Sequence, residues 1–501
     1  MFSRLTSWLS GGPRLRLAVV TPVGPGHADL YTQCRASVEA AWQHGRGPFT
    51  ALECIAVDDG EGRLGRSRAR NEGIARAAAA GADWLFFLDA DDLMVEGAFA
   101  TVAPYLAGAD AVWGLILGLA PAAERPHLRV PQIVAMDSLD DLLLFDPFLT
   151  LQMGHFVRTP VAQAIGFDEA LDAGEDFDYY LRLWARYRGL KVPREFFINR
   201  HARHSGGPRA ASAEDWGRTV RERQRDERVR RNLPPDAPAA RARRTARIGE
   251  LQAFCRGQGL VAAGDAPSLA AQMPYAGTLE VNEYEGGTLR LQCADDDPAC
   301  AQLAWTGEYR PFAAALWQAL AARGSSVVDI GARNGLFALL AARAGAARVV
   351  VGGEPAALAR VREDCALNEV AVECVVAGAG GEPAGRAVDA YLRQAAGAAP
   401  GAIHVSGMDA AGILHGLLPA LAQERPELLI DAADGSDLSA VMQALQGTAY
   451  RLWRIDEAGH ALVPCAEAGV AREAVAVLAS VRAPKEVGVI VTAAHGSVRE
   501  A

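Results

Sequence analysis

Short apolar runs alternate with longer amphipathic stretches from Arg16 to about Gly207. The runs RLAVVTPV, ALECIAVDD and DWLFFLDAD are rich in Val, Ile, Leu and Phe, whereas GRSRARNEGIARAAAAG has the spacing of a helix. Alternation of strands with helices is typical of α/β units on a mainly parallel sheet. We therefore expect an α/β domain over residues 14–209.

This alternation stops over residues 210–264, where the chain is dense in Arg and poor in apolar residues. Pro234 and Pro235 interrupt the segment, which predicts two linker helices with a break between them. Acidic residues such as Glu222 and Glu227 are interspersed among the arginines, as expected for solvated helices with internal ion pairs. An anchor for nucleic acid or anionic lipid is the alternative.

A second alternation follows the Arg-rich segment. GTLEVNEYEGGTLRLQC predicts a β-hairpin with Gly286 and Gly287 at its turn. SSVVDIGARNGLFALLAARAGAARVVVGGEP then has the pattern of a strand, a glycine loop, a helix and a second strand. The expected fold class is therefore α/β, with a second α/β domain over residues 265–495 joined to the first by the helical linker.

Composition agrees with two domains. The chain has 501 residues, half of them hydrophobic, and a single core rarely grows beyond about 250–300 residues. The 60 acidic and 50 basic residues give a net charge of -10, which offers no overall support for nucleic-acid binding. The eight cysteines form no C-x-x-C pair, so neither a zinc site nor a disulfide framework is indicated, and a reducing cytoplasm fits best.

The start of the chain, MFSRLTSWLSGGPRLRLAVV, is a short amphipathic stretch. It lacks the continuous apolar core and the small-residue cleavage site of a secretory signal. No segment of the sequence reaches the roughly 20 apolar residues that span a bilayer. We expect a frayed terminus of a cytoplasmic protein, with a peripheral contact to the cytoplasmic face of the inner membrane as the alternative.

Three carboxylates crowd the end of the apolar run in WLFFLDADDL, at Asp89, Asp91 and Asp92. Such like charges repel one another and lose hydration unless a cation or a donor-rich ligand compensates them. Asp58 and Asp59 end another apolar run, and the carboxyl ends of parallel strands face one cleft. Oxygen ligands at this density suit Mg²⁺ or Mn²⁺, which bridges carboxylates to substrate phosphates. Turns and helix caps are the simpler alternative for aspartates.

Five motifs in order, VVTPVGPG, IAVDDGEG, GRSRARNEGI, FFLDADD and GEDFDYYLRLW, resemble family 2 glycosyltransferases of GT-A fold over about Leu17 to Gly207. The resemblance implies transfer of a sugar from a nucleotide-diphosphate sugar to a glycan or lipid-linked saccharide. In this family Pro22 and Val23 would line the nucleotide pocket and Asp59 would face the base. The full set of donor contacts that the resemblance implies is Pro22, Val23, Asp58, Asp59, Arg66, Arg70, Asn71 and Asp89, with Arg66, Arg70 and Asn71 near the diphosphate.

The resemblance also implies a metal site. The spacing of DADD favours Asp91 as the metal ligand, with Asp89 beside it and directed toward the ribose. The family often places a late histidine near the metal and the diphosphate, and NRHARHSGG offers His204, with His201 as the alternative. A surface histidine is the simpler explanation of either residue.

Sugar transfer requires an acid-base group, because the acceptor hydroxyl loses a proton as it attacks the anomeric carbon. Asp176 in GEDFD matches the position of the family's base, and Glu175 is the alternative. A single displacement with one base inverts the anomeric configuration, so an inverting enzyme is expected. Capping of the helix FDYYLRLWARY would explain the same carboxylates without catalysis.

A second candidate site lies in VVDIGARNGLF, which places Asp329, Gly331 and Gly335 between a strand and an apolar helix. Arg333 stands where a dinucleotide-binding G-x-G-x-x-G has its second glycine, which disfavours NAD. Glu354, at the end of the next strand, lies where a carboxylate accepts hydrogen bonds from a ribose diol. This pairing fits S-adenosylmethionine, although glycine turns between a strand and a helix are also common packing devices.

The motifs DDPACAQLAWTGEYRP, DIGARNGLFALLAA, GGEP, RAVDAYL and RPELLIDA resemble FkbM-type methyltransferases over about Thr278 to Val491. That family usually carries I-K-x-D-x-E-G where this chain has Ser406, Gly407 and Met408, with Asp409 as the acid nearby. The expected protein is a bifunctional glycan-assembly enzyme that adds a sugar and O-methylates a glycan. The alternative is a glycosyltransferase whose second domain is a non-catalytic binding or docking module.

Overall fold

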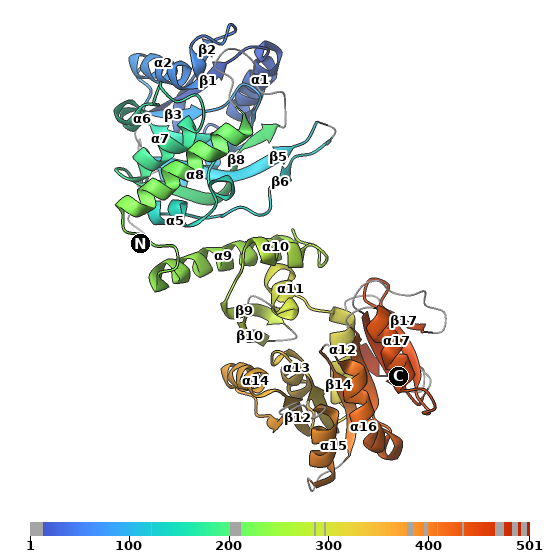
Figure 1. Ribbon diagram of the computed structural model, residues 1–501. Coiled ribbons are helices and arrows are strands. Elements are labelled where there is room, and N and C mark those ends of the chain that lie inside the picture. Colours follow the sequence, from blue (N-terminus) through green and yellow to red (C-terminus); the bar gives the residue numbers. More distant parts are fainter. Residues whose placement is uncertain are drawn as a thin grey trace, which may run out of the picture. The chain divides into compact units, whose positions relative to one another are not determined.

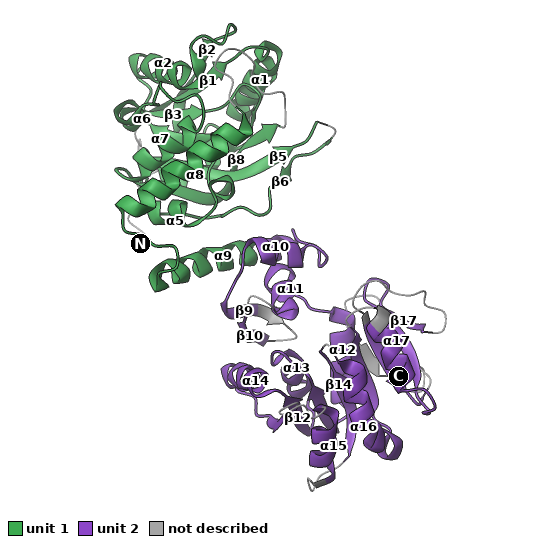
Figure 2. Ribbon diagram, in the orientation of Figure 1, with its two compact units in different colours: residues 1–254 green, residues 255–501 purple. Residues whose placement is uncertain are grey.

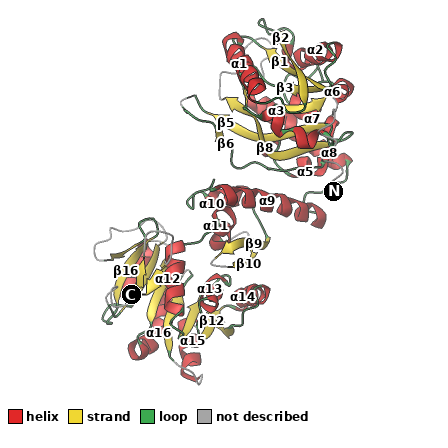
Figure 3. Ribbon diagram, turned by 180° about the vertical axis from the view of Figure 1, so that it is seen from behind, coloured by secondary structure: helices red, strands yellow, loops and turns green. Residues whose placement is uncertain are grey.

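The computed structural model describes residues 14–121, 123–200, 212–284, 287–294, 297–377, 384–394, 399–407, 409–432, 435–465, 475–482, 489–491 and 498–500. The chain divides into two compact units, residues 1–254 and 255–501 (Figure 2). Both are α/β, which confirms the predicted fold class. Strands of each unit gather in a central sheet with helices beside it (Figure 3).

The first unit is built on an eight-stranded sheet in the order β2-β1-β3-β7-β5-β8-β4, with β6 paired to β5 (Figure 1). Its strands are β1 (Leu15–Val23), β2 (Phe49–Asp58), β3 (Trp84–Phe87), β4 (Leu93–Met94), β5 (Ala111–Leu119), β6 (His127–Leu128), β7 (His155–Arg158) and β8 (Gly189–Arg200). The pairs of β1 with β2, β1 with β3, and β5 with β8 are parallel. Since β7 and β4 run antiparallel to their neighbours, this sheet is mixed rather than mainly parallel.

β3 shows why an uninterrupted apolar run forms this strand. Trp84 and Phe86 lie in the core cluster that also holds residues of α1. Phe87 points to the opposite face, where its ring contacts Phe167 and Tyr179. A strand buried on both faces needs apolar residues at every position, and the chain turns polar at Asp89 as soon as the strand has left the core.

Helices pack beside this sheet, and two more, α8 and α9, follow its last strand along the chain. They are α1 (Ala28–His44), α2 (Gly65–Ala79), α3 (Ala98–Thr101), α4 (Ala103–Leu106), α5 (Leu139–Leu144), the 3-10 helix Pro147–Leu149, α6 (Thr159–Ile165), α7 (Glu175–Trp184), α8 (Ala213–Arg230) and α9 (Pro238–Gln258). α8 and α9 are the two helices predicted for residues 210–264. They belong largely to the first compact unit, whose boundary falls between Phe254 and Cys255.

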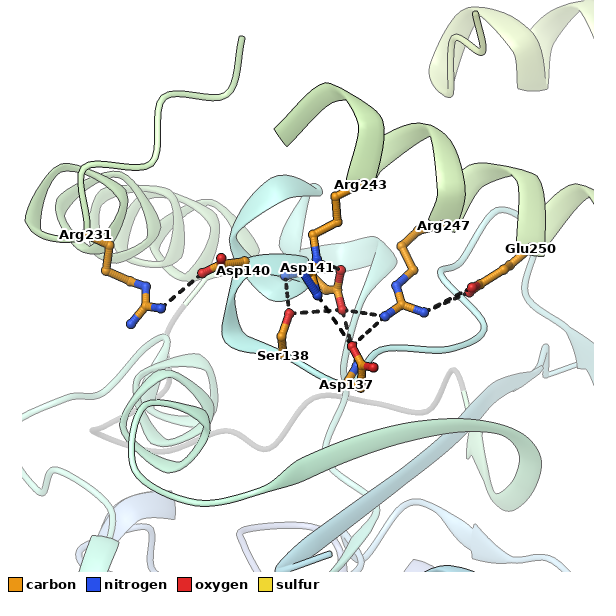
Figure 4. A network of polar contacts seen from close by, with 8 residues as sticks. All are labelled: Asp137, Ser138, Asp140, Asp141, Arg231, Arg243, Arg247 and Glu250. Carbon is orange, nitrogen blue, oxygen red and sulfur yellow. Dashed lines mark hydrogen bonds and ion pairs between the residues drawn. The ribbon is translucent and has the colours of Figure 1, made fainter. Parts of the chain in front are cut away.

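Arginines of α9 attach this helix to the N-terminal end of α5 (Figure 4). The fully buried Asp141 accepts hydrogen bonds from Arg243 at 2.7 Å and from Arg247 at 2.9 Å, and these bonds hold its pKa below the usual range despite burial. Arg247 also contacts Asp137 at 2.6 Å. These two arginines therefore pair with carboxylates of the first unit, and the pairs hold α9 against α5.

The second unit is built on the sheet β13-β12-β11-β14-β15-β18-β16-β17. The first five strands are parallel to one another. Numbered in chain order from β11, they have the Rossmann-like order 3-2-1-4-5. β18, β16 and β17 are antiparallel to their neighbours. Their bounds are β11 (Ser326–Ile330), β12 (Arg348–Gly353), β13 (Glu373–Val376), β14 (Pro400–Val405), β15 (Glu427–Ala432), β16 (Arg451–Asp456), β17 (Ala461–Pro464) and β18 (Val475–Ser480). The chain reverses direction across this sheet between β11 and β14, where such sheets bind ligands.

The predicted hairpin is present as β9 (Gly277–Tyr284) and β10 (Gly287–Cys293), and a second short pair is formed by β19 (Val489–Val491) and β20 (Val498–Glu500). The helices are α10 (Ala266–Gln272), α11 (Pro298–Thr306), α12 (Pro311–Ala321), α13 (Leu336–Arg343), α14 (Pro355–Leu367), α15 (Ala384–Gln394), α16 (Ala410–Glu424) and α17 (Gly435–Ala444). Across the described ranges, no helix combines the length and the apolar character that crossing a membrane requires.

Candidate functional site

The loop after β2 is fixed by a carboxylate. Asp59 is buried, and its two side-chain oxygens accept hydrogen bonds from the backbone N–H groups of Leu64 at 3.0 Å and Gly65 at 2.9 Å, where α2 begins. A carboxylate at this end of a helix satisfies donors that have no partner within the helix. Asp58 accepts from the backbone of Gly60 at 2.9 Å. The IAVDDGEG motif thus positions α2 and the arginines on it.

Arg70 on α2 supplies part of the positive charge that the acidic cluster requires. Its buried guanidinium donates to Asp89 Oδ1 at 2.8 Å and to Glu175 Oε1 at 2.9 Å. Burial alone would lower the pKa of Arg70, but the two carboxylates outweigh burial and raise that pKa. One side chain therefore connects the end of β3 to the start of α7.

Asp92 has a structural role in the cluster. It is buried and accepts hydrogen bonds from Asn199 Nδ2 and from the backbone N–H of Arg200, both at 3.1 Å. Burial, with Asp91 and Asp89 nearby, raises its pKa well above the ordinary value. The Arg200 side chain donates to the backbone carbonyl of Asp91. Together these contacts fasten the end of β8 to the loop after β3.

Asp91, the predicted metal ligand, is half-buried, as is Asp89. Burial and the neighbouring Asp89 raise its pKa, while His27 and Arg200 lower it. A carboxylate whose ionised form is disfavoured in this way would gain from a divalent cation. Within the part of the chain that the structure describes, no three His, Cys, Asp or Glu side chains are grouped to hold a metal. The predicted ligands His204 and His201 lie outside the described residues.

Asp176 stands at the start of α7. Its Oδ1 accepts hydrogen bonds from the backbone N–H of Phe177 at 2.8 Å and from Trp216 Nε1 at 2.9 Å. Burial and the adjacent Glu175 raise its pKa to about 6. Glu175 is bound to Arg70, so the geometry favours Asp176 over Glu175 as the carboxylate available to take a proton near neutral pH.

The other predicted donor contacts lie on the same elements. Pro22 and Val23 end β1, and the Val23 carbonyl accepts the backbone N–H of Asp59 at 2.8 Å. Arg66 is half-buried on the first turn of α2. Asn71 is engaged elsewhere, because its amide exchanges hydrogen bonds with the backbone of Phe167 at 2.7 and 2.9 Å. The structure thus assigns Asn71 a fold-positioning contact that its motif did not reveal.

In the second unit, the predicted glycines are explained by packing. Gly331 has a φ of +83°, and a Cβ at this position would lie 1.9 Å from the backbone oxygen of Ser406. Gly335 donates its N–H to Asp364 Oδ2 at 2.8 Å, and a Cβ there would meet Asp364 Cβ at 2.8 Å. A larger residue at Gly331 would therefore disturb the fold before it could obstruct a ligand. Glu354 follows β12 directly and is exposed. This is the carboxylate that was predicted to bind the ribose of the donor.

A buried charge network at the carboxyl ends of β11, β14 and β15 was missed from the sequence. His404 Nδ1 lies 2.8 Å from Asp329 Oδ1, and His404 Nε2 lies 3.7 Å from Asp431 Oδ2. Arg310 forms an ion pair with Asp431, and the His404 ring stacks on Phe337 at 4.0 Å. The sequence offered one signal for this network, namely the single polar residues His404 and Asp431 inside the apolar runs AIHV and LLIDA.

This network predicts a loss of stability at alkaline pH. Burial lowers the pKa of His404, but Asp329 and Asp431 outweigh it and raise the pKa to about 9. Because the folded pKa exceeds the unfolded one, the stabilisation is complete below about pH 6.5 and is lost as the pH rises through 9; a shift of this size corresponds to about 3 kcal/mol. Chemical denaturation of the second unit at pH 6.5 and 9 should show this loss.

Two variants separate this effect from general alkaline denaturation. His404→Gln should remove the difference between the two pH values, because the titrating group is gone. His415→Gln changes an exposed histidine on α16 and should keep the wild-type loss. An equal loss in wild type and His404→Gln would contradict the assignment of the alkaline transition to this network.

Comparisons with known proteins give only distant likenesses. No family model matches the chain, and no curated protein matches it. Residues 1–349 of S. aureus TarS, solved with UDP-GlcNAc, are 15% identical over 52% of this chain and 82% of that chain, with a TM-score of 0.32. Cofactor-bound Rv0187 from MTB is 19% identical over 34% of this chain and 79% of that chain, with a TM-score of 0.25.

The O-methyltransferase TomG from Streptomyces achromogenes, solved with SAM, is 16% identical over 34% of this chain and 79% of that chain, with a TM-score of 0.24. These likenesses are too distant to carry a conclusion about activity. The assignment of two α/β domains, the second with a Rossmann-like strand order, rests on the strand orders given above.

Proposed function

We propose that the first unit transfers a sugar from a nucleotide-diphosphate sugar to a hydroxyl of a glycan or lipid-linked saccharide, with inversion at the anomeric carbon. The observation that supports this proposal is the division of the carboxylates around Arg70. Arg70 binds Asp89 and Glu175, which leaves Asp91 and Asp176 outside these ion pairs, and both have raised pKa values. Asp91 suits the role of a metal ligand, and Asp176 suits the role of a proton acceptor.

In this proposal Asp91, with Asp89 and with His204 or His201, would hold Mn²⁺ or Mg²⁺. The metal would supply positive charge to the donor diphosphate and so stabilise it as a leaving group. Asp176 would receive the proton of the acceptor hydroxyl as that oxygen attacks the sugar. The buried Arg70 would hold the end of β3 and the start of α7 at a fixed spacing.

The metal role predicts the behaviour of Asp91→Ala. With Mn²⁺ present, one of a panel of UDP-, GDP- and dTDP-linked hexoses should raise the melting temperature of the wild-type protein, because a ligand that binds only the folded state stabilises it. Asp91→Ala should fold and lose this metal-dependent shift, since removing one carboxylate relieves repulsion within the cluster. Thermal shift with and without Mn²⁺ measures both results.

The matched control is Asp226→Ala, which removes an exposed carboxylate from α8. It should keep the full metal-dependent shift. A metal-dependent shift of wild-type size in Asp91→Ala would exclude this residue as the metal ligand.

For the second unit we propose O-methylation of a glycan with S-adenosylmethionine as the donor. Glu354 would bind the ribose, and the loop of Asp329, Gly331 and Gly335 would lie beside the donor. The alternative, a non-catalytic binding or docking module, is favoured by one observation. The strand-end carboxylates Asp329 and Asp431 are both engaged by His404, so neither stands free as a base.

Glu354→Ala distinguishes a donor site from its absence. A carboxylate that accepts two hydrogen bonds from the ribose should contribute at least about tenfold to donor affinity, since bonds to a charged group are worth roughly 1.5–3 kcal/mol each. Calorimetry of the full chain with S-adenosylmethionine measures this loss, and Glu363→Ala, an exposed change on α14, should retain wild-type affinity. Binding without methyl transfer would favour the module, and no binding by the wild type would remove the donor proposal.

A further inference from the structure

α8, the first of the two helices expected to form a linker, packs against the start of α7. Gly174, with a φ of +74°, immediately precedes α7, and a Cβ at this glycine would lie 3.0 Å from Thr219 Cγ2 of α8. Val220 is buried, and Gln224 donates hydrogen bonds to the backbone carbonyls of Leu142 at 3.2 Å and Phe145 at 2.7 Å. The helix therefore has a buried face within the first unit.

This packing brings an indole to the proposed base. Ser212 caps α8 by accepting the backbone N–H of Asp215 at 3.0 Å, which places Trp216 within the first turns of the helix. Trp216 Nε1 donates to Asp176 Oδ1 at 2.9 Å. The Trp216 ring also packs on Phe148, with the ring centroids 4.5 Å apart. One side chain is thus held by its ring and directs its N–H to the carboxylate.

We propose that Trp216 is a positioning residue for Asp176, holding Oδ1 so that Oδ2 is presented to the acceptor hydroxyl. The inference rests on the proposed sugar transfer, and it makes α8 part of the transferase site. A hydrogen bond to one carboxylate oxygen fixes the plane of the group and favours its ionised form.

Other groups facing Asp176 act on it differently. Glu175 raises its pKa and Arg70 lowers it, while Tyr180 is a neighbour on α7 whose own pKa Asp176 helps to raise. Among the described residues, the side chain that donates a hydrogen bond to Asp176 is Trp216. Losing the indole N–H should therefore change both the acidity and the direction of Asp176 without changing the charges around it.

The test is the titration of Asp176 in the full-length protein, followed by NMR of ¹³Cγ-labelled aspartate. The signal that disappears in Asp176→Asn identifies the residue. Its midpoint in the wild type should be about 6. Trp216→Phe keeps an aromatic ring beside Phe148 and removes the N–H, so its midpoint should rise by about one pH unit, which is a tenfold change in acidity. Phe148→Tyr keeps both the ring that packs on Trp216 and the Trp216 N–H, and should leave the midpoint within about 0.3 units of the wild type.

Turnover of the panel of UDP-, GDP- and dTDP-linked hexoses provides the catalytic readout. In Trp216→Phe, the pH at which kcat falls to half on the acid side should rise by the same amount as the NMR midpoint. The KM for the nucleotide sugar should not change. The positioning role would be overturned if Trp216→Phe had the same Asp176 titration and the same pH profile of kcat as the wild type. If Asp176→Asn abolishes turnover while Trp216→Phe behaves as wild type, only this inference fails. If Asp176→Asn keeps full turnover, the proposed base fails, and the catalytic role of Trp216 fails with it.

Discussion

Asp176→Asn is expected to keep nucleotide-sugar binding and to lose sugar transfer by about 10²–10⁴-fold, the usual worth of general-base assistance. The amide matches the carboxylate in size but cannot accept the acceptor proton. The hydrogen bonds from Phe177 and Trp216 both end on Oδ1, and the amide oxygen of Asn can accept both. The loss should therefore appear in kcat, which steady-state kinetics on the identified donor and acceptor would measure.

The same assignment predicts the pH dependence of the wild-type enzyme. With its pKa raised to about 6, Asp176 is a competent base above that pH, and transfer should fall as the pH drops through 6 and the carboxylate takes up a proton. Asp172→Asn, an exposed change nearby, should retain the wild-type rate and profile. If Asp176→Asn transfers sugar at the wild-type rate, the base is Glu175 or another group.

Arg70→Met should be among the most destabilising single changes in the first unit, at about 3–5 kcal/mol, because it leaves the buried Glu175 without its partner. Arg70 is the ion-pair partner of both Asp89 and the buried Glu175. Urea denaturation of the first unit at pH 7 measures the loss.

Arg76→Met is the matched control, because Arg76 lies on the same helix and pairs with Glu72 at the surface. An exposed pair of this kind contributes between 0 and about 1 kcal/mol. Similar losses of stability in the two variants would contradict the view that Arg70 compensates buried charge.

The alternation of apolar and polar runs was enough to predict two α/β domains, because strands buried on both faces require uninterrupted apolar residues. Strand direction was not visible in this pattern. β7 lies between β3 and β5 and is antiparallel to both, yet the apolar content of HFVR is the same for either direction. The mainly parallel sheet predicted for residues 14–209 was therefore wrong, whereas five neighbouring strands of the second unit are parallel.

The site was predicted only as far as it lies within short motifs. DADD and GEDFD marked Asp89, Asp91 and Asp176, but the link between the two motifs is Arg70, which pairs with a residue 105 positions away. The Arg-rich segment shows the same limit. Pairs within a helix, such as Arg230 with Glu227, follow from spacing, whereas the contact of Arg243 with Asp141 depends on how α9 packs on α5. Ion pairs between distant segments require the fold to be known.

The stereochemistry of donor hydrolysis tests the central claim most directly. Without an acceptor, water takes the place of the hydroxyl, and the proposed single displacement assisted by Asp176 must place it on the face opposite the leaving diphosphate. Early ¹H NMR spectra of the anomeric proton, recorded before mutarotation, should show that an α-linked nucleotide sugar gives the β-sugar. Initial release of the α-sugar would contradict inversion and, with it, the assignment of Asp176 as the base of a single displacement.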